Sequence, residues 1–143
     1  MWYGENGCGL AKLTQVPPRD RGSSLEISVS AIYFTPMWNP TQDRDFNSSE
    51  RIRKILQDGG TQLLPEAVEK ELSFREIKGK MGIDYYFRIT DKAPSIKAGE
   101  YRYMNQGGIP VSNLLVMFTI LSNEKDSVDI PIAREIIANA IQK

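Results

Sequence analysis

Residues 71–123 contain several short runs in which apolar and polar side chains alternate, and glycine, proline or charged residues separate the runs. Neighbouring side chains on a β-strand point to opposite faces, so this alternation predicts strands that bury one face. Gly107 and Gly108 follow one of these runs and can adopt the positive φ of a hairpin turn. The pattern therefore predicts four consecutive strands, at residues 72–77, 81–90, 101–106 and 114–121.

Two of these runs indicate where the core lies. Residues 114–121 are apolar at almost every position, which is typical of a strand covered on both faces, so we place this strand at the centre of the sheet. The strand at residues 83–89 hides an aromatic-rich face that includes Tyr85 and Phe87. We expect this face to pack beneath a helix formed by residues 133–141.

The chain before residue 37 divides into two parts. Residues 24–36 alternate apolar and polar side chains until Pro36 and so predict another strand. Residues 1–23 contain four glycines and two prolines with little periodicity, which favours an irregular lead-in that holds at most one short strand, at residues 9–16. We therefore expect a single α+β domain in residues 24–143, preceded by an irregular segment.

Two amphipathic helices complete the predicted elements. The first begins at Asn47, which can cap it, and ends at Gly59 and Gly60, because glycine accepts the left-handed conformation that closes helices. The second begins with Asp129 as its cap and has Pro131 in its first turn. The apolar side chains expected to face the sheet are Ile52, Ile55 and Leu56 in the first helix and Ala133, Ile136, Ile137, Ala140 and Ile141 in the second.

The composition excludes several classes of function. The 143 residues include 18 Lys or Arg and 18 Asp or Glu, so the chain lacks the positive excess of a nucleic-acid-binding protein. The absence of histidine excludes Ser-His and Cys-His nucleophilic pairs and His-ligated zinc. The single cysteine, Cys8, cannot form an internal disulfide. We therefore expect no nucleic-acid partner, no metal and no cofactor.

The sequence does not place the protein in a compartment. No segment approaches the roughly 20 apolar residues that span a bilayer, and the N-terminus lacks the charged and apolar regions of a signal peptide. We expect no membrane span. The chain fits a cytoplasmic location, and equally an extracytoplasmic one after removal of a signal, and its oligomeric state is left open.

Two groups of residues are candidates for a functional site. The first is Met37 and Trp38, which lie in a loop between prolines and are either folded back into the core or exposed as a protein contact. The second group consists of Asp84, Tyr86, Arg88 and Glu100. The first three alternate onto one strand face, opposite Ile83 and Tyr85, where they could line a cleft if no helix covers them.

The same region resembles a known family. Residues 77–91, with the sequence IKGKMGIDYYFRITD, precede YMNQGG at residues 103–108 and FTILS at residues 118–122. This series is similar to the distal half of the Mog1/PsbP-like superfamily, and the resemblance covers residues 24–143. It implies an α/β/α sandwich with a central, mainly antiparallel sheet and a C-terminal amphipathic helix. It also implies a non-enzymatic protein that binds or assembles other proteins, without assigning partner-binding residues.

Two functions remain open at this point. The first is a non-enzymatic protein-binding or accessory domain, favoured by the missing histidine, by the absence of a recognisable catalytic constellation and by the resemblance. The alternative is a small-ligand-binding or hydrolytic enzyme that uses carboxylates and tyrosines of the sheet. A pocket in which the second group converges would favour the alternative.

Overall fold

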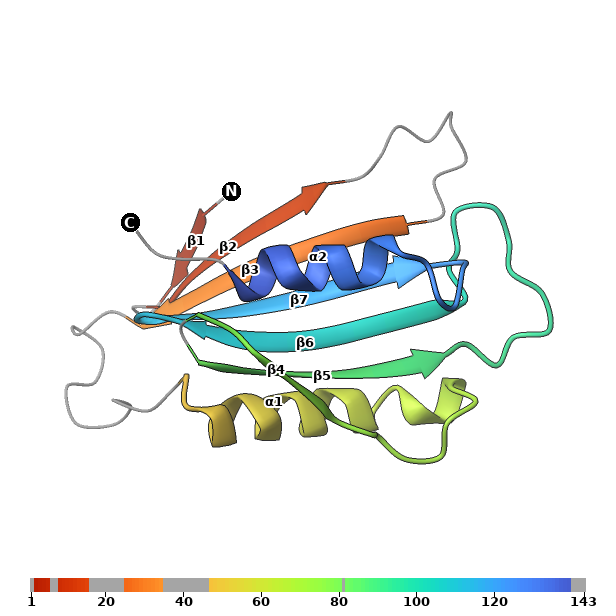
Figure 1. Ribbon diagram of the computed structural model, residues 1–143, viewed down its shortest axis with the longest axis horizontal. Coiled ribbons are helices and arrows are strands. Elements are labelled where there is room, and N and C mark those ends of the chain that lie inside the picture. The colour runs from red at the N-terminus through yellow and green to blue at the C-terminus, as the bar shows by residue number, and fades with distance from the viewer. Residues whose placement is uncertain (1, 6–7, 16–24, 35–46, 81, 140–143) are drawn as a thin grey trace.

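Figure 1 shows the computed structural model, which describes residues 2–5, 8–15, 25–34, 47–80 and 82–139. For residues 2–5, 8–15 and 33–34 the structure describes the backbone alone. The elements, in chain order, are β1 (Trp2–Glu5), β2 (Cys8–Gln15), β3 (Leu25–Phe34), α1 (Ser49–Thr61), the 3-10 turn η2 (Leu64–Glu66), β4 (Arg75–Lys78), β5 (Ile83–Thr90), β6 (Tyr103–Val111), β7 (Leu114–Ser122) and α2 (Asp129–Ala138). The predicted α+β class is confirmed.

The described strands form one seven-stranded sheet in the order β1-β2-β3-β7-β6-β5-β4. Every neighbouring pair is antiparallel, in agreement with the mainly antiparallel sheet that was expected. Two series of sequential strands, β1 to β3 and β4 to β7, therefore meet where β3 pairs with β7. Strand β7 is the fourth of the seven, which confirms its predicted central place.

Each helix packs on its own face of the sheet. Ile52 and Leu56 of α1 pack with Phe87 of β5 and with Leu115 of β7. Val116, which follows Leu115 in β7, belongs to a second cluster. In this cluster it packs with three residues of α2: Ile130, Ala133 and Ile137. Successive residues of a strand point to opposite faces, so the two clusters lie on opposite sides of the sheet. We call these sides the α1 face and the α2 face.

The helix that covers the aromatic-rich side of β5 differs from the prediction. Phe87 and Ile89 are buried against α1, not against the C-terminal helix. The alternation of apolar and polar residues showed that this face is buried. Such a pattern contains no information about which helix covers the face. Helix α1 lies in the chain between β3 and the edge strand β4, and it packs along β6 and β5, roughly parallel to the strands (Figure 1).

Gly107 and Gly108 do not form a turn but lie inside β6, paired with Phe118 and Met117 of β7. Glycine is required there by close packing. A Cβ atom on Gly107 would overlap the ring of Phe118, and one on Gly108 would lie 2.8 Å from the Ile52 Cγ2 atom of α1. The hairpin turn lies instead at Ser112, whose φ is 56°. The predicted third strand is therefore too short.

The ends of α1 also differ from the prediction. Ser48 is the N-cap, and its hydroxyl accepts a hydrogen bond from the backbone N–H of Arg51. Asn47 instead donates from Nδ2 to the carbonyl oxygens of Ser112 (2.8 Å) and Leu114 (2.9 Å), which fastens the start of α1 to the β6–β7 turn. Gly60 lies within the helix rather than beyond it.

The N-terminal residues contain more regular structure than predicted. Strand β2 pairs with β3 along its whole length, from Cys8 opposite Phe34 to Gln15 opposite Ile27, and β1 pairs with β2. The short strand expected at residues 9–16 is thus present. An irregular lead-in is wrong for residues 2–5 and 8–15, because these strands belong to the same sheet as the predicted domain.

No helix in the described part of the chain is long and apolar enough to cross a membrane.

Candidate functional site

A cavity lies on the α2 face, beside the helix. Helix α2 packs over the apolar residues of β3 and β7. Its ribbon lies away from β5 in Figure 1, and the same face of β5 carries Tyr86, which packs against residues of α2, and the partly exposed Arg88. The resulting cavity has a volume of about 380 Å³. Its lining residues are Glu69, Ser73, Arg75, Tyr86, Arg88, Asn105, Lys125, Asp126, Ser127, Ile130, Pro131 and Arg134.

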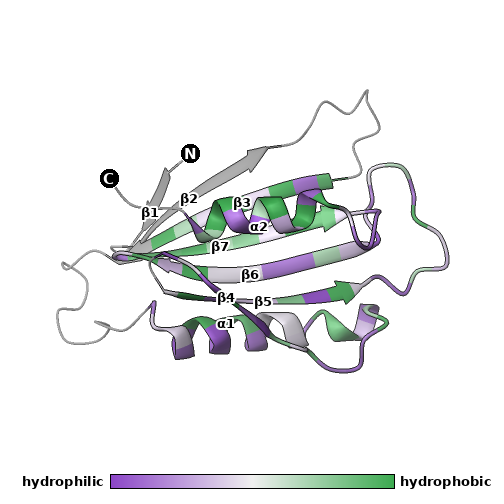
Figure 2. Ribbon diagram, in the orientation of Figure 1, coloured by the Kyte–Doolittle hydropathy of each residue, from purple (hydrophilic) through white to green (hydrophobic). Residues whose placement is uncertain are grey.

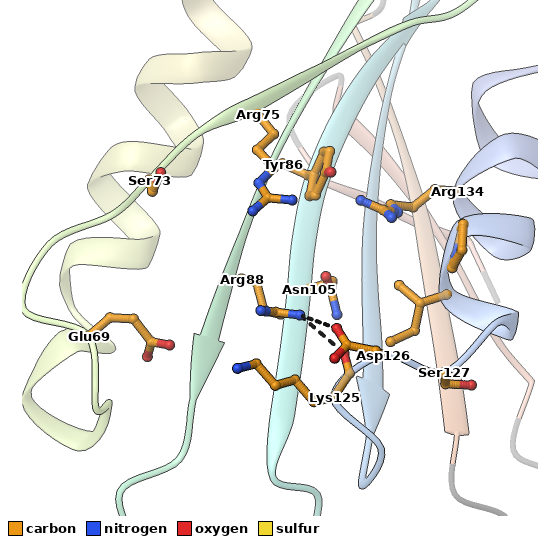
Figure 3. Close-up of a pocket in the computed structure, with 12 residues that line it drawn as sticks. Glu69, Ser73, Arg75, Tyr86, Arg88, Asn105, Lys125, Asp126, Ser127 and Arg134 are labelled. Carbon is orange, nitrogen blue, oxygen red and sulfur yellow. Dashed lines mark hydrogen bonds and ion pairs between the residues drawn. The ribbon is translucent and has the colours of Figure 1, made fainter.

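The sheet supplies the floor of this cavity. Arg75 of β4 is directly opposite Tyr86 of β5, and Arg88 of β5 is directly opposite Asn105 of β6. Directly opposed residues of an antiparallel pair share a face, so the register brings these four side chains together. Figure 3 shows Arg75, Tyr86, Arg88 and Asn105 around one opening, with Arg134 of α2 reaching toward it from the other side.

The wall formed by α2 places a guanidinium above the floor. Arg134 lies over the Tyr86 ring, with its Cζ atom 4.3 Å from the ring centroid, a cation–π arrangement. The Nε atom of Arg134 is buried and has no hydrogen-bond partner among the described residues. Among the described residues, the guanidinium thus has the Tyr86 ring as its neighbour and forms no ion pair with a carboxylate.

Positive charge exceeds negative charge in the lining. Four cationic side chains face two carboxylates, an excess of two formal positive charges. Both carboxylates have partners: Glu69 accepts hydrogen bonds from the backbone N–H (2.7 Å) and the hydroxyl (2.8 Å) of Thr90. Asp126 lies 3.6 Å from the Nη1 atom of Arg88 and its side chain is 84% exposed, so water screens this pair strongly.

Asn105 adds an unusual polar group. The residue is only 3% exposed, and its Nδ2 atom has no hydrogen-bond partner among the described residues. Buried amides nearly always form hydrogen bonds, because an unpaired donor loses its hydration without compensation. The Asn105 amide is therefore a free donor at the floor of a positively charged cavity.

The structure brings together only part of the predicted cleft. Tyr86 and Arg88 line the cavity, but Asp84 and Glu100 lie outside its lining. Glu100 is exposed in the loop after β5, where its carboxylate accepts a hydrogen bond from the backbone N–H of Lys97 (2.9 Å). The alternation correctly placed Asp84, Tyr86 and Arg88 on one face of β5. The cavity, however, extends only over Tyr86 and Arg88 and does not reach Asp84.

Asp84 is buried at the start of β5. It is 1% exposed, and its Oδ1 atom has no hydrogen-bond partner in the described part of the chain. A Cβ atom on Gly79 would lie 3.0 Å from this oxygen and 2.8 Å from the carbonyl oxygen of Ala138, so the carboxyl lies close to the end of α2. Desolvation by burial raises the pKa of Asp84 from 3.8 to about 7.

The outward side of α2 is a second unusual feature. Val128, Ile132 and Ile136 are 73%, 52% and 69% exposed. They are four residues apart, so they form one stripe along the helix. The sequence had indicated that Ile136 faces the sheet, which is wrong, whereas Ala133 and Ile137 are buried as predicted. Figure 2 shows hydrophobic positions recurring along α2, in contrast to the mainly hydrophilic α1.

Met37 and Trp38, the predicted protein contact, lie outside the described residues, and so do Ala140 and Ile141. Among the residues that are described, no three Cys, Asp or Glu side chains gather as a metal site would require. Of the residues that line the cavity, sequence reasoning identified only Tyr86 and Arg88, and it missed Arg75, Asn105, Lys125 and Arg134 among others. Only Arg75 carried a signal, since the alternation in its strand places it on the same face as Ser73, which also lines the cavity.

No family model matches this chain, and no curated protein is significantly similar to it. The resemblance to Mog1/PsbP-like proteins therefore stays a prediction.

Proposed function

We propose that the protein is a non-enzymatic accessory domain that binds another protein through the outward side of α2. The observation that carries the proposal is the stripe of Val128, Ile132 and Ile136. A helix at the surface of a globular protein normally turns its apolar residues to the core and polar residues to water. Helix α2 has apolar residues on both sides, which is typical of a helix covered by a second macromolecule.

The spacing of the stripe suits a particular kind of contact. Apolar anchors separated by four residues are what an amphipathic helix presents to an apolar groove or to another helix. The proposed partner is a different protein that offers such a surface. The zero net charge favours a protein partner over a nucleic acid. The missing histidine argues against the common forms of histidine-dependent catalysis.

We further propose that the fold is an α/β/α sandwich of the Mog1/PsbP type. The packing of α1 and α2 against separate clusters supports this assignment. Strands β1 and β2 extend the same sheet but lie outside residues 24–143, which the resemblance covers. Under this proposal the protein needs no cofactor, and its role is to bind or help assemble its partner.

The test is co-purification from cells of the source organism with three tagged forms of the protein. We expect the wild type and Lys54→Asp to retain the same partner and Ile136→Asp to lose it. Lys54 is the matched control because it is an exposed residue of α1, on the opposite face. Circular dichroism must show that all forms are folded. Equal retention by Ile136→Asp would contradict the proposal, and so would a partner that proves to be a second copy of this chain.

Met37 and Trp38 are the second candidate contact, retained from the sequence. Trp38→Ala in the same experiment separates the two surfaces. Loss of the partner with Trp38→Ala, but not with Ile136→Asp, would assign the contact to that loop instead of α2.

A further inference from the structure

We infer that the cavity beside α2 is a binding site for a small organic anion whose carboxylate or phosphate group is held by Arg88, Arg134 and Asn105. This inference concerns a different surface from the outward stripe of α2 and goes beyond the proposed protein contact. It is carried by three observations: uncompensated positive charge, buried donors without acceptors, and a cavity of suitable size with apolar walls.

The first observation is the charge. Among the described residues, neither Arg75 nor Arg134 forms an ion pair. Arg88 donates from Nη1 to the carbonyl oxygen of Lys125 (3.1 Å), and its only described carboxylate neighbour, the exposed Asp126, is 3.6 Å away. Arginine carries a planar fork of donors that matches the oxygens of a carboxylate or phosphate. Three arginines around one opening, from β4, β5 and α2, thus provide the geometry for an oxyanion (Figure 3).

The second observation is the pair of donors without acceptors. Asn105 Nδ2 and Arg134 Nε are both buried and unpartnered in the described part of the chain, and both residues line the cavity. A ligand with several acceptor oxygens would give each of these donors a partner. An anion supplies such acceptors, whereas a cation would be repelled by the arginines.

The third observation is size and the nature of the walls. A volume of about 380 Å³ lies in the range of small-molecule sites. The Tyr86 ring, Ile130 and Pro131 supply apolar surface next to the guanidinium groups. This combination fits a ligand with an apolar part beside its anionic group better than it fits a simple inorganic ion.

The experiment is an isothermal titration of the full chain with four probes: phenyl phosphate, benzoate, inorganic phosphate and the uncharged benzamide. We expect phenyl phosphate and benzoate to bind, inorganic phosphate to bind more weakly, and benzamide to show no binding. The ratio of the affinities for phenyl phosphate and benzoate distinguishes a site for a phosphate from a site for a carboxylate. In a parallel ¹⁵N-NMR titration, the side-chain amide signals of Asn105 should shift with the same dissociation constant.

Arg134→Gln should weaken binding at least about tenfold, because a charge-assisted hydrogen bond is lost. The matched control is Arg53→Gln. Arg53 lies over the Phe74 ring at 5.7 Å on α1, so this variant removes the same charge and a comparable aromatic contact away from the cavity. We expect it to bind like the wild type, and Ile136→Asp likewise.

Two results would overturn the inference. The first is that no anionic probe binds to the wild type and the Asn105 signals do not shift. This result does not depend on the folding of any variant. The other is equal loss of affinity in Arg134→Gln and Arg53→Gln. Because Ile136→Asp tests the protein contact separately, failure of the anion site and failure of the proposed function can be distinguished.

Discussion

The buried carboxyl of Asp84 should make the stability of the fold depend on pH. Its pKa is raised from 3.8 to about 7 by desolvation, so the native state holds a proton that the unfolded state releases over this interval. The native state binds more protons, and the free energy of unfolding therefore falls as the pH rises from about 4 to about 7 and then levels off. The ionised form is the destabilising one.

The size of the effect follows from the shift. A shift from 3.8 to about 7 corresponds to at most about 4 kcal/mol when the group is fully ionised. Between about pH 5 and about pH 8 this carboxyl should remove about 2–3 kcal/mol from the free energy of unfolding. With no histidine in the chain, few other groups titrate in this window.

Asp84→Asn removes the titrating proton with little change of shape. Urea unfolding of wild type and variant at both pH values should show that the variant gains about 2–3 kcal/mol relative to wild type on going from the lower to the higher pH. Any constant effect of the amide cancels in this comparison. Asp58→Asn is the control, since Asp58 is exposed and forms an ion pair with the equally exposed Lys54. A difference between wild type and Asp84→Asn that is the same at both pH values would refute the reasoning.

Further predictions concern packing and the start of α1. Gly59→Ala should raise the free energy of unfolding by up to about 1 kcal/mol, because nothing lies within 4 Å of the added Cβ and alanine favours helix. Gly60→Ala should lower it by about 1–3 kcal/mol, since its Cβ would lie 2.7 Å from Phe87 Cζ. Asn47→Ala should cost about 1–3 kcal/mol, because the carbonyls of the β6–β7 turn lose its two hydrogen bonds. Thermal and urea unfolding measure all three, and a stabilised Gly60→Ala or an unchanged Asn47→Ala would contradict the packing described.

The sequence predicted the elements whose signals are local. The apolar run of β7 identified the centre of the sheet, and alternation placed Tyr86 and Arg88 on one face of β5. Errors arose where one residue type serves two purposes. Glycine signals a turn or a helix end, but Gly60 and Gly107 are needed because other side chains pack against their backbone.

The cavity could not be predicted for a different reason. Its residues come from β4, β5, β6, α2 and two connecting segments, so they meet only when the strand register and the position of α2 are known. No sequence pattern indicated that Arg134 would lie over Tyr86. The exposed stripe of α2 was missed because periodicity predicts one buried face and gives no means of recognising a second apolar face.

Site-specific photo-crosslinking tests the central claim, the protein contact on α2, most directly. A photoreactive side chain at Val128, the most exposed apolar residue described on this stripe, should form a discrete adduct with the partner protein in cells of the source organism. The same side chain at Lys54 should form no such adduct, and Ile136→Asp should abolish the adduct from Val128. No adduct from Val128, or one that persists with Ile136→Asp, would contradict the account.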